Sequence, residues 1–413
     1  MGRLSYIFLR TMVSKQMTDC ISMWPRFEQD ELDAVQKVLE SGRVNYWTGE
    51  QCKLFEKEFA AFHHCEHAIS LANGTLALEL AIYAFDIADG DEVIVPSRTF
   101  IATASAVVAR GATPVVADVD ENSGNITVET IDKVRTCRTK AIIPVHLAGY
   151  PCAMNDIMEY ARSHELTVIE DCAQAHGAEC DGQKVGSFGD AAIFSFCQDK
   201  IMTTGGEGGI LLVKDEVRWK KAWAYKDHGK NYDIAHKCES RQGYRWLHES
   251  FGSNYRMTEM QAAIGRKQLV KLPHWLERRM ENANMLINRL SSNCLVRFST
   301  VPSNYKHAYY KLYCYIQKDF LKHGWTRDRI IKEINKLGVP CYSGSCSEIY
   351  LEKAFSNLKP YPKDRLTVAK ALGEASLMLP IDHTVSSESI IFIADVVESV
   401  LVRASHIPSS LNT

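Results

Sequence analysis

The sequence has no excess of charge of either sign. Its 413 residues contain 48 Lys and Arg against 50 Asp and Glu, a formal net charge of −2. It contains no run of basic residues and no helix-turn-helix pattern. A nucleic-acid-binding domain usually carries a basic patch or stripe. We therefore expect no nucleic-acid partner.

Long apolar runs and paired cysteine motifs are also absent. The apolar patch from Tyr6 to Leu9 is too short for a membrane span and lacks the features of a secretory signal. The 13 cysteines form no CxxC pair and no Cys/His array at zinc spacing. We expect a cytoplasmic protein with reduced thiols, no membrane association and no metal site.

Two stretches carry the chemistry of the chain. In VIEDCAQAHGA, from Val168 to Ala178, a short apolar strand ends at Asp171. In SFCQDKIMTTGGEGG, from Ser195 to Gly209, a second strand ends just before Lys200. Ligands of open α/β sheets bind where strands end. A carboxylate and an amine there suit pyridoxal phosphate (PLP), with Lys200 forming the Schiff base and Asp171 pairing with the pyridinium nitrogen. Taken singly, Lys200 could be an ordinary loop lysine and Asp171 could be a capping residue.

A third stretch has the pattern of a phosphate site. A short strand, residues 68 to 72, runs through Asn73, Gly74 and Thr75 into a helix. Free backbone N–H groups and the helix dipole favour an anion at such a helix start. The alternative is an ordinary helix N-terminus.

The order of predicted elements indicates an α/β fold. Strands at residues 91 to 96, 113 to 117 and 139 to 145 alternate with helices, which predicts a mainly parallel, covered sheet. Helices at 258 to 269 and 275 to 290 then lead to an α+β pattern from residue 296. We expect an N-terminal extension (1–23), a large domain (24–275) and a small C-terminal domain (276–413).

The motifs SFxxxKxxTTGxEGG and EDxAQAHGA resemble those of the DegT/StrS sugar aminotransferases, from Trp24 to about Val402. This family belongs to the fold type I PLP enzymes of the aspartate aminotransferase superfamily. The resemblance implies a large domain with a mainly parallel mixed sheet covered by helices, and a smaller C-terminal α+β domain. Lysine rather than histidine at position 200 favours transamination over the dehydration catalysed by some relatives. The extra glycine at Gly205–Gly206 departs from the simplest family pattern.

The resemblance also implies roles for individual residues. Besides Lys200 and Asp171, it places the following at the cofactor: Gly74, Thr75 and Ser195 at the phosphate, Phe100 stacked on the ring, Gln174 at the ring's oxygen substituent, and Asn254 reaching the phosphate from the partner subunit of a homodimer. Phe100 could instead belong to the core, and Asn254 could only form an Asx-turn before the next helix. His146 fits a family position, but we interpret it as a hydrogen-bonded core histidine.

The implied reaction moves an amino group from an amino acid, expected to be L-glutamate, to a nucleotide-linked keto sugar. A 4-keto-6-deoxyhexose is expected, in the synthesis of a surface polysaccharide or glycoside. Three alternatives stay open: a 3-keto sugar, a cyclitol ketone, or a PLP-binding regulatory protein. A polar segment, residues 231 to 249, and three residues before it, Lys226, His228 and Lys230, are candidates for contacting the diphosphate. They could equally form a solvated loop.

Overall fold

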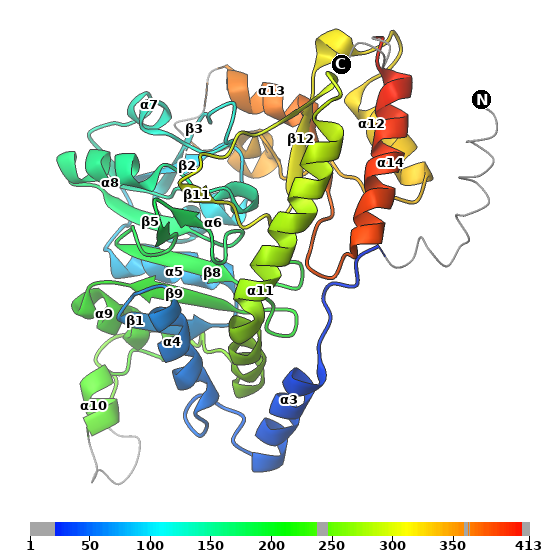
Figure 1. Cartoon of the computed structure of the whole chain (residues 1–413). Helices are drawn as coiled ribbons and strands as arrows, with labels where there is room; N and C mark the ends of the chain where they lie inside the picture. Colours follow the sequence, from blue (N-terminus) through cyan, green and yellow to red (C-terminus); the bar gives the residue numbers. More distant parts are fainter. Residues whose placement is uncertain (1–20, 238–246, 359–361, 363, 407–413) are drawn as a thin grey trace.

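The computed structural model describes residues 21–237, 247–358, 362 and 364–406 (Figure 1). Its largest sheet has seven strands in the order β1-β9-β8-β5-β4-β2-β3. β9 runs antiparallel to β1 and β8, and the other neighbours are parallel. The strands are β1 (His67–Leu71), β2 (Glu92–Pro96), β3 (Thr113–Ala117), β4 (Thr139–Ile142), β5 (Thr167–Asp171), β8 (Ala191–Ser195) and β9 (Gly209–Val213). The prediction of a mainly parallel mixed sheet is confirmed.

Helices flank this sheet because its strands are mostly apolar and are buried along most of their length. Every residue of β2, β8 and β9 is buried, so both faces of the sheet need cover. α5 packs on β8 and β9, and α4 packs on β1. The flanking helices are α4 (Gln51–Phe62), α5 (Gly74–Ala84), α6 (Ala102–Ala109), α7 (Val128–Asp132), α8 (Met154–Ser163) and α9 (Glu216–Lys226). The first helix, α3 (Gln29–Ser41), instead packs against the long helix α11 (Glu259–Leu290).

One long helix, α11 (Glu259–Leu290), joins the two ends of the molecule (Figure 1). Two helices were predicted here, and that prediction is wrong. Pro273 removes one hydrogen bond from the helix, but Leu272 and Leu276 around it are buried and hold the helix together. The expected domain boundary at residues 275/276 therefore falls inside a continuous helix.

The C-terminal part is built on a three-stranded antiparallel sheet in the order β10-β12-β13. Its strands are β10 (Val296–Phe298), β12 (Leu312–Ile316) and β13 (Ser376–Leu379). Its helices are α12 (Arg327–Lys336), α13 (Thr367–Ala375) and α14 (Ser387–Ala404), and α14 packs along α11. The α+β prediction is confirmed, although the sequence pattern did not reveal β13.

Several short elements complete the described chain. A third sheet in the order β11-β6-β7 pairs Tyr305–Lys306 with Glu179–Cys180, which in turn pairs with Gln183–Lys184. The 3-10 helices are η1 (Leu147–Gly149), η2 (Lys318–Phe320), η3 (Ile349–Leu351) and η4 (Lys353–Phe355). The polar segment after residue 230 begins with α10 (Tyr232–Lys237). In the chain that the structure describes, no helix is long and apolar enough to cross a membrane.

The start of the described chain packs on the C-terminal part. Ile21 is buried in its core, and the Ser22 hydroxyl donates to Asp382 over 2.6 Å. The last residues of the expected N-terminal extension are therefore part of the folded body, whereas residues 1–20 lie outside the described residues.

Candidate active site

A cavity of about 850 Å³ lies between the strand ends of the large sheet and the C-terminal part. It is large enough for a cofactor together with part of a substrate. The large sheet and its helices supply most of the residues predicted from the sequence, which are Gly74, Thr75, Phe100, Asp171, Gln174, Ser195 and Lys200. The C-terminal part supplies Tyr310, Lys311, Tyr313, Tyr342, Gly344, Ser345 and Met378. Residues far apart in the sequence thus meet in one site.

Asp171, at the end of β5, is a buried carboxylate with two hydrogen-bond donors. The Thr103 hydroxyl donates to Oδ2 over 2.9 Å, and the Ala173 N–H donates to Oδ1 over 3.1 Å. Burial raises the pKa of Asp171 above its ordinary value, against the opposing effect of these donors and of Lys200. A cationic N–H group bound beside the carboxylate would stabilise its ionised form. The protonated ring nitrogen of PLP is such a group, so the site fits this cofactor.

Lys200 lies in the loop after β8 and is held through its backbone. Its N–H donates to the Cys197 carbonyl over 3.0 Å, and its own carbonyl accepts the Trp24 indole N–H over 2.8 Å. Its Nζ lies 5.0 Å from the centre of the Tyr310 ring. The backbone contacts fix the loop and leave the amine at the cavity.

Asp199, the residue before Lys200, adds a negative charge beside the amine. The Tyr310 hydroxyl donates to its carboxylate. Burial alone would raise the pKa of Asp199, but Lys200 and this hydroxyl outweigh that effect and lower it. Tyr310, Thr103 and Trp24 were all missed from the sequence. None of the three had a clear signal in the sequence. In the structure the Thr103 hydroxyl also contacts the Thr99 hydroxyl, 3.0 Å away.

The start of α5 forms the other end of the cavity. The Asn73 side chain accepts the Leu76 N–H over 2.9 Å, while the first N–H groups of the helix have no acceptor one turn earlier within the helix. A Cβ on Gly74 would lie 2.8 Å from the Ser195 Cβ, so only glycine allows this close approach. Thr75 and Ser195 line the same end with hydroxyl groups. Free N–H groups and hydroxyls around a helix start suit the phosphate of PLP.

Phe100 and Gln174 line the cavity in different ways. Phe100 is 68% exposed, which excludes the alternative that it belongs to the core. Gln174 is buried, and its Oε1 accepts the Ala148 N–H over 2.7 Å. Their contacts with the cofactor ring stay predictions.

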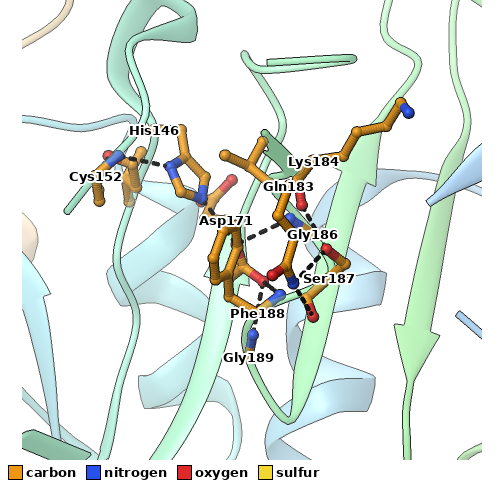
Figure 2. Close-up of polar contacts among 12 residues, drawn as sticks. His146, Cys152, Asp171, Gln183, Lys184, Gly186, Ser187, Phe188 and Gly189 are labelled. Atoms are coloured by element: carbon orange, nitrogen blue, oxygen red, sulfur yellow. Dashed lines mark hydrogen bonds and ion pairs between the residues drawn. The ribbon is translucent and has the colours of Figure 1, made fainter. Parts of the chain in front are cut away.

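Behind Asp171, a buried network fixes the strand ends (Figure 2). The Glu170 carboxylate accepts the N–H groups of Gly186, Phe188 and Gly189 over 2.8, 2.9 and 2.7 Å. His146 Nδ1 accepts the Cys152 N–H over 3.0 Å, so its ring proton lies on Nε2, which donates to Glu170 over 3.2 Å. The interpretation of His146 as a hydrogen-bonded core histidine is confirmed.

Two other predicted contacts lie outside the cavity. Asn254 is exposed, does not line the cavity of its own chain, and accepts the Arg256 N–H over 3.4 Å. Lys226 was a candidate for the diphosphate, but it is fully buried, with its Nζ 3.7 Å from the centre of the Tyr46 ring. That prediction is wrong for Lys226, because α9 turns its side chain into the core. Arg241 and Arg245 of the polar segment lie outside the described residues.

Comparison with known proteins identifies the family of this chain. The model of the DegT/DnrJ/EryC1/StrS aminotransferase family matches residues 25–400. GDP-perosamine synthase of Escherichia coli O157:H7 is 33% identical over 371 residues, which cover 90% of this chain and 95% of the relative. dTDP-3-amino-3,4,6-trideoxy-alpha-D-glucose transaminase of Streptomyces venezuelae is 33% identical, over 84% and 86% of the two chains. The X-ray structure of an aminotransferase from Psychrobacter cryohalolentis shows 52% identity and a TM-score of 0.91, over 93% and 99% of the chains.

The fold and the site thus define a fold type I PLP enzyme. The chain belongs to the DegT/DnrJ/EryC1/StrS aminotransferase family, as its motifs predicted. It is a PLP-dependent aminotransferase, and the alternative of a PLP-binding regulatory protein is set aside.

Proposed function

We propose that this enzyme transfers an amino group from L-glutamate to a nucleotide-linked keto sugar, and that the sugar is a 4-keto-6-deoxyhexose. The observation that carries the proposal is the meeting of Lys200, Asp171 and the start of α5 around one cavity of about 850 Å³. The proposal of a nucleotide-linked substrate rests on the relatives, which include a GDP-perosamine synthase and a dTDP-amino-sugar transaminase.

Each residue has a defined task in this proposal. PLP, when bound, supplies an electron sink that makes the substrate's α-proton removable. Lys200 would anchor the cofactor and, once displaced by the amino donor, would carry the proton from the α-carbon of the amino acid to the cofactor carbon that receives the amino group, as general base and then acid. Asp171 keeps the ring nitrogen protonated. The Gly74 and Thr75 N–H groups and the Thr75 and Ser195 hydroxyls hold the phosphate.

The active unit in our proposal is a homodimer in the cytoplasm. Phe100 presents an exposed aromatic ring at the cavity, and Asn254 is exposed outside it. A second copy that covers Phe100 and brings its own Asn254 to the phosphate would account for both features. Every cysteine in the described residues is a free thiol, which supports a reducing compartment.

The carbon that receives the amino group distinguishes the proposal from its nearest alternative. The relatives include enzymes named for 3-amino sugars as well as the perosamine synthases. Another relative is named 3-amino-5-hydroxybenzoate synthase, a product that is not a sugar, so the cyclitol ketone also stays an alternative.

Half-reaction spectroscopy tests the proposal. The enzyme is first converted to the amine form of its cofactor with L-glutamate and freed of excess donor. Keto sugar nucleotides with the carbonyl at carbon 4 or carbon 3, and a free cyclitol ketone, are then added separately. We expect the original cofactor absorbance to return with the 4-keto sugar. Return with the 3-keto sugar alone would reverse the regiochemistry, and return with the cyclitol alone would remove the nucleotide sugar from the proposal.

A further inference from the structure

Lys311 places a second lysine amine in the cavity wall. It lies just before β12, so it comes from the C-terminal part, whereas Lys200 comes from the large sheet. The Nζ atoms of both lysines lie 5.0 Å from the centre of the Tyr310 ring. Lys311 carries none of the predicted roles, and its position became visible only when the fold brought the two parts together.

The charge of Lys311 is not matched by a partner. Within the described residues, its Nζ has no hydrogen bond or ion pair, and its one aromatic contact is the Tyr310 ring, 5.0 Å away. Burial, followed by the charge of Arg279, lowers the pKa of Lys311. Asp199 opposes this shift but is itself engaged with Tyr310. An anion that binds in the cavity would therefore stabilise the Lys311 ammonium.

Two polar groups accompany Lys311 on the same wall. Lys311 and Tyr313 are two residues apart at the start of the strand, so their side chains point to the same face. The Tyr313 hydroxyl accepts the Ser345 N–H over 2.7 Å and donates to the Ser345 hydroxyl over 3.2 Å. A Cβ on Gly344 would lie 2.1 Å from the Tyr313 ring, so the glycine lets this backbone approach the ring closely. Tyr313 thus holds the Ser345 hydroxyl, whose own proton can be donated to a ligand. An ammonium beside such a hydroxyl is a suitable pair of donors for a carboxylate.

The other cations of the wall narrow the choice of ligand. In the part of the cavity wall that the structure describes, the cationic side chains are Lys200 and Lys311, and no arginine contributes. Lys200 is committed to the cofactor in the proposed function. An amino-acid donor must bring its α-carbon to Lys200 while its carboxylate needs a cation nearby. The acceptor carries a diphosphate on its nucleotide, but its keto ring, the part that must reach Lys200, carries no charge.

We propose that Lys311 binds a carboxylate of the amino-acid donor and so determines the specificity of the first half-reaction. The inference rests on the proposed function and goes beyond it by naming the residue that recognises the donor. Lys311 acts here as a point charge, with Tyr313 and Ser345 as the accompanying hydroxyls.

The test compares the two half-reactions in variants of the PLP-loaded enzyme. Lys311→Met removes the charge, and Lys311→Arg keeps it. Lys306→Met is a matched control, because Lys306 is partly exposed and does not line the cavity. We expect Lys311→Met to raise the KM for L-glutamate and lower kcat/KM about 10- to 100-fold, the effect of losing a hydrogen bond to a charged group. Lys311→Arg should recover most of this loss. The half-reaction with the keto sugar should change by less than about threefold.

The choice of donor shows which carboxylate is bound. A loss with L-glutamate, L-glutamine and L-alanine alike assigns Lys311 to the α-carboxylate, and a loss with L-glutamate alone assigns it to the side-chain carboxylate. An equal loss in both half-reactions, a loss confined to the sugar half-reaction, or no loss would overturn the proposal. Failure of the parent enzyme to accept any amino acid would instead refute the proposed function itself.

Discussion

We propose that Asp171, whose burial disfavours its charge, has a role in catalysis. Its carboxylate is buried, and burial raises its pKa, so the ionised form is disfavoured in the cofactor-free fold. A bound pyridinium N–H offsets that cost by pairing with the charge. In the cofactor-free fold the Asp171 carboxylate thus lacks a cationic partner, and this is why we assign it to the ring nitrogen of the cofactor.

Replacement of Asp171 by asparagine should separate the two effects. Asp171→Asn keeps the shape and can still bond Thr103 and the Ala173 N–H, so the protein should fold. Activity should fall at least about 100-fold, as when a preorganised electrostatic partner is lost. The cofactor-free variant should have a higher Tm than the parent at pH 7, because the neutral amide avoids burying a charge.

The Tm difference between the parent and Asp171→Asn should depend on pH. The folded-state pKa of Asp171 is raised, so the parent is destabilised above that pKa, where the carboxylate is ionised. The Tm advantage of Asp171→Asn should shrink as the pH is lowered through the pKa of Asp171. An advantage that grows with falling pH, or near-normal turnover of the variant, would contradict the assignment.

Glu170 has a structural role that a single substitution can isolate. Each of its oxygens accepts two donors, with the Phe188 and Gly189 N–H groups on Oε1 and Gly186 and His146 on Oε2. Glu170→Gln must turn an NH₂ group toward one of these pairs. Chemical denaturation should show a loss of about 1–3 kcal/mol, the cost of leaving buried donors unpaired. Glu179→Gln, at a partly exposed ion pair, is the control and should cost less than about 1 kcal/mol.

At the scale of elements, the segment before α3 connects the C-terminal part to the loop after β8, which carries Lys200. The Trp24 ring packs edge-on against Trp275 and His383, at centroid distances of 5.3 and 4.7 Å, while its N–H bonds the Lys200 carbonyl. Ile21 and Ser22 anchor the same segment to the C-terminal part. This short segment thus supports the loop that carries Lys200.

A pair of variants tests the importance of this segment. A chain that begins at Met17 keeps Ile21, Ser22 and Trp24, and we expect it to fold and to retain full activity. Trp24→Phe keeps the ring but loses the hydrogen bond to the Lys200 loop, so kcat/KM should fall about 3- to 10-fold. Loss of soluble protein on truncation at Met17 would show that residues 1–16 are needed for folding.

The elements also show which features the sequence could predict. The βα alternation and the apolar strands are local patterns, so the large sheet and its order of elements were predictable. α11 was predicted as two helices because Pro273 is a local breaker, whereas the helix is held by packing along its length. β13 was missed because Ser376–Leu379 is short and pairs with β12, about 60 residues earlier in the chain.

The site residues also divide into those that the sequence could predict and those that it could not. Lys200, Asp171 and the Asn73–Thr75 turn follow strands in recognisable motifs, and the structure brings them to one cavity. Tyr310 and Lys311 come from the C-terminal part and have no motif of their own. Their proximity to Lys200 depends on how the two parts pack, which no local pattern encodes.

At the scale of the whole molecule, we propose that two chains share their active sites. Lys200→Ala and Asn254→Ala should each be poorly active alone. In a mixed dimer one site collects both defects and the other is intact. If subunits mix at random, half of the dimers are mixed, and each of these has one intact site of two. Refolding the two variants together should therefore restore up to about a quarter of the parent activity. Native mass spectrometry should confirm the mixed dimers. If they form and no activity returns, Asn254 does not act in trans.

The central claim is that Lys200 holds the cofactor in this cavity. Borohydride reduction of the PLP-loaded enzyme, followed by peptide mapping, tests it most directly, because reduction fixes the cofactor to the lysine that carries it. We predict a single label, on the peptide that contains Lys200, and its loss in Lys200→Ala. A label on Lys311, the other lysine of the cavity wall, or on Lys184, Lys214 or Lys226, would contradict the account.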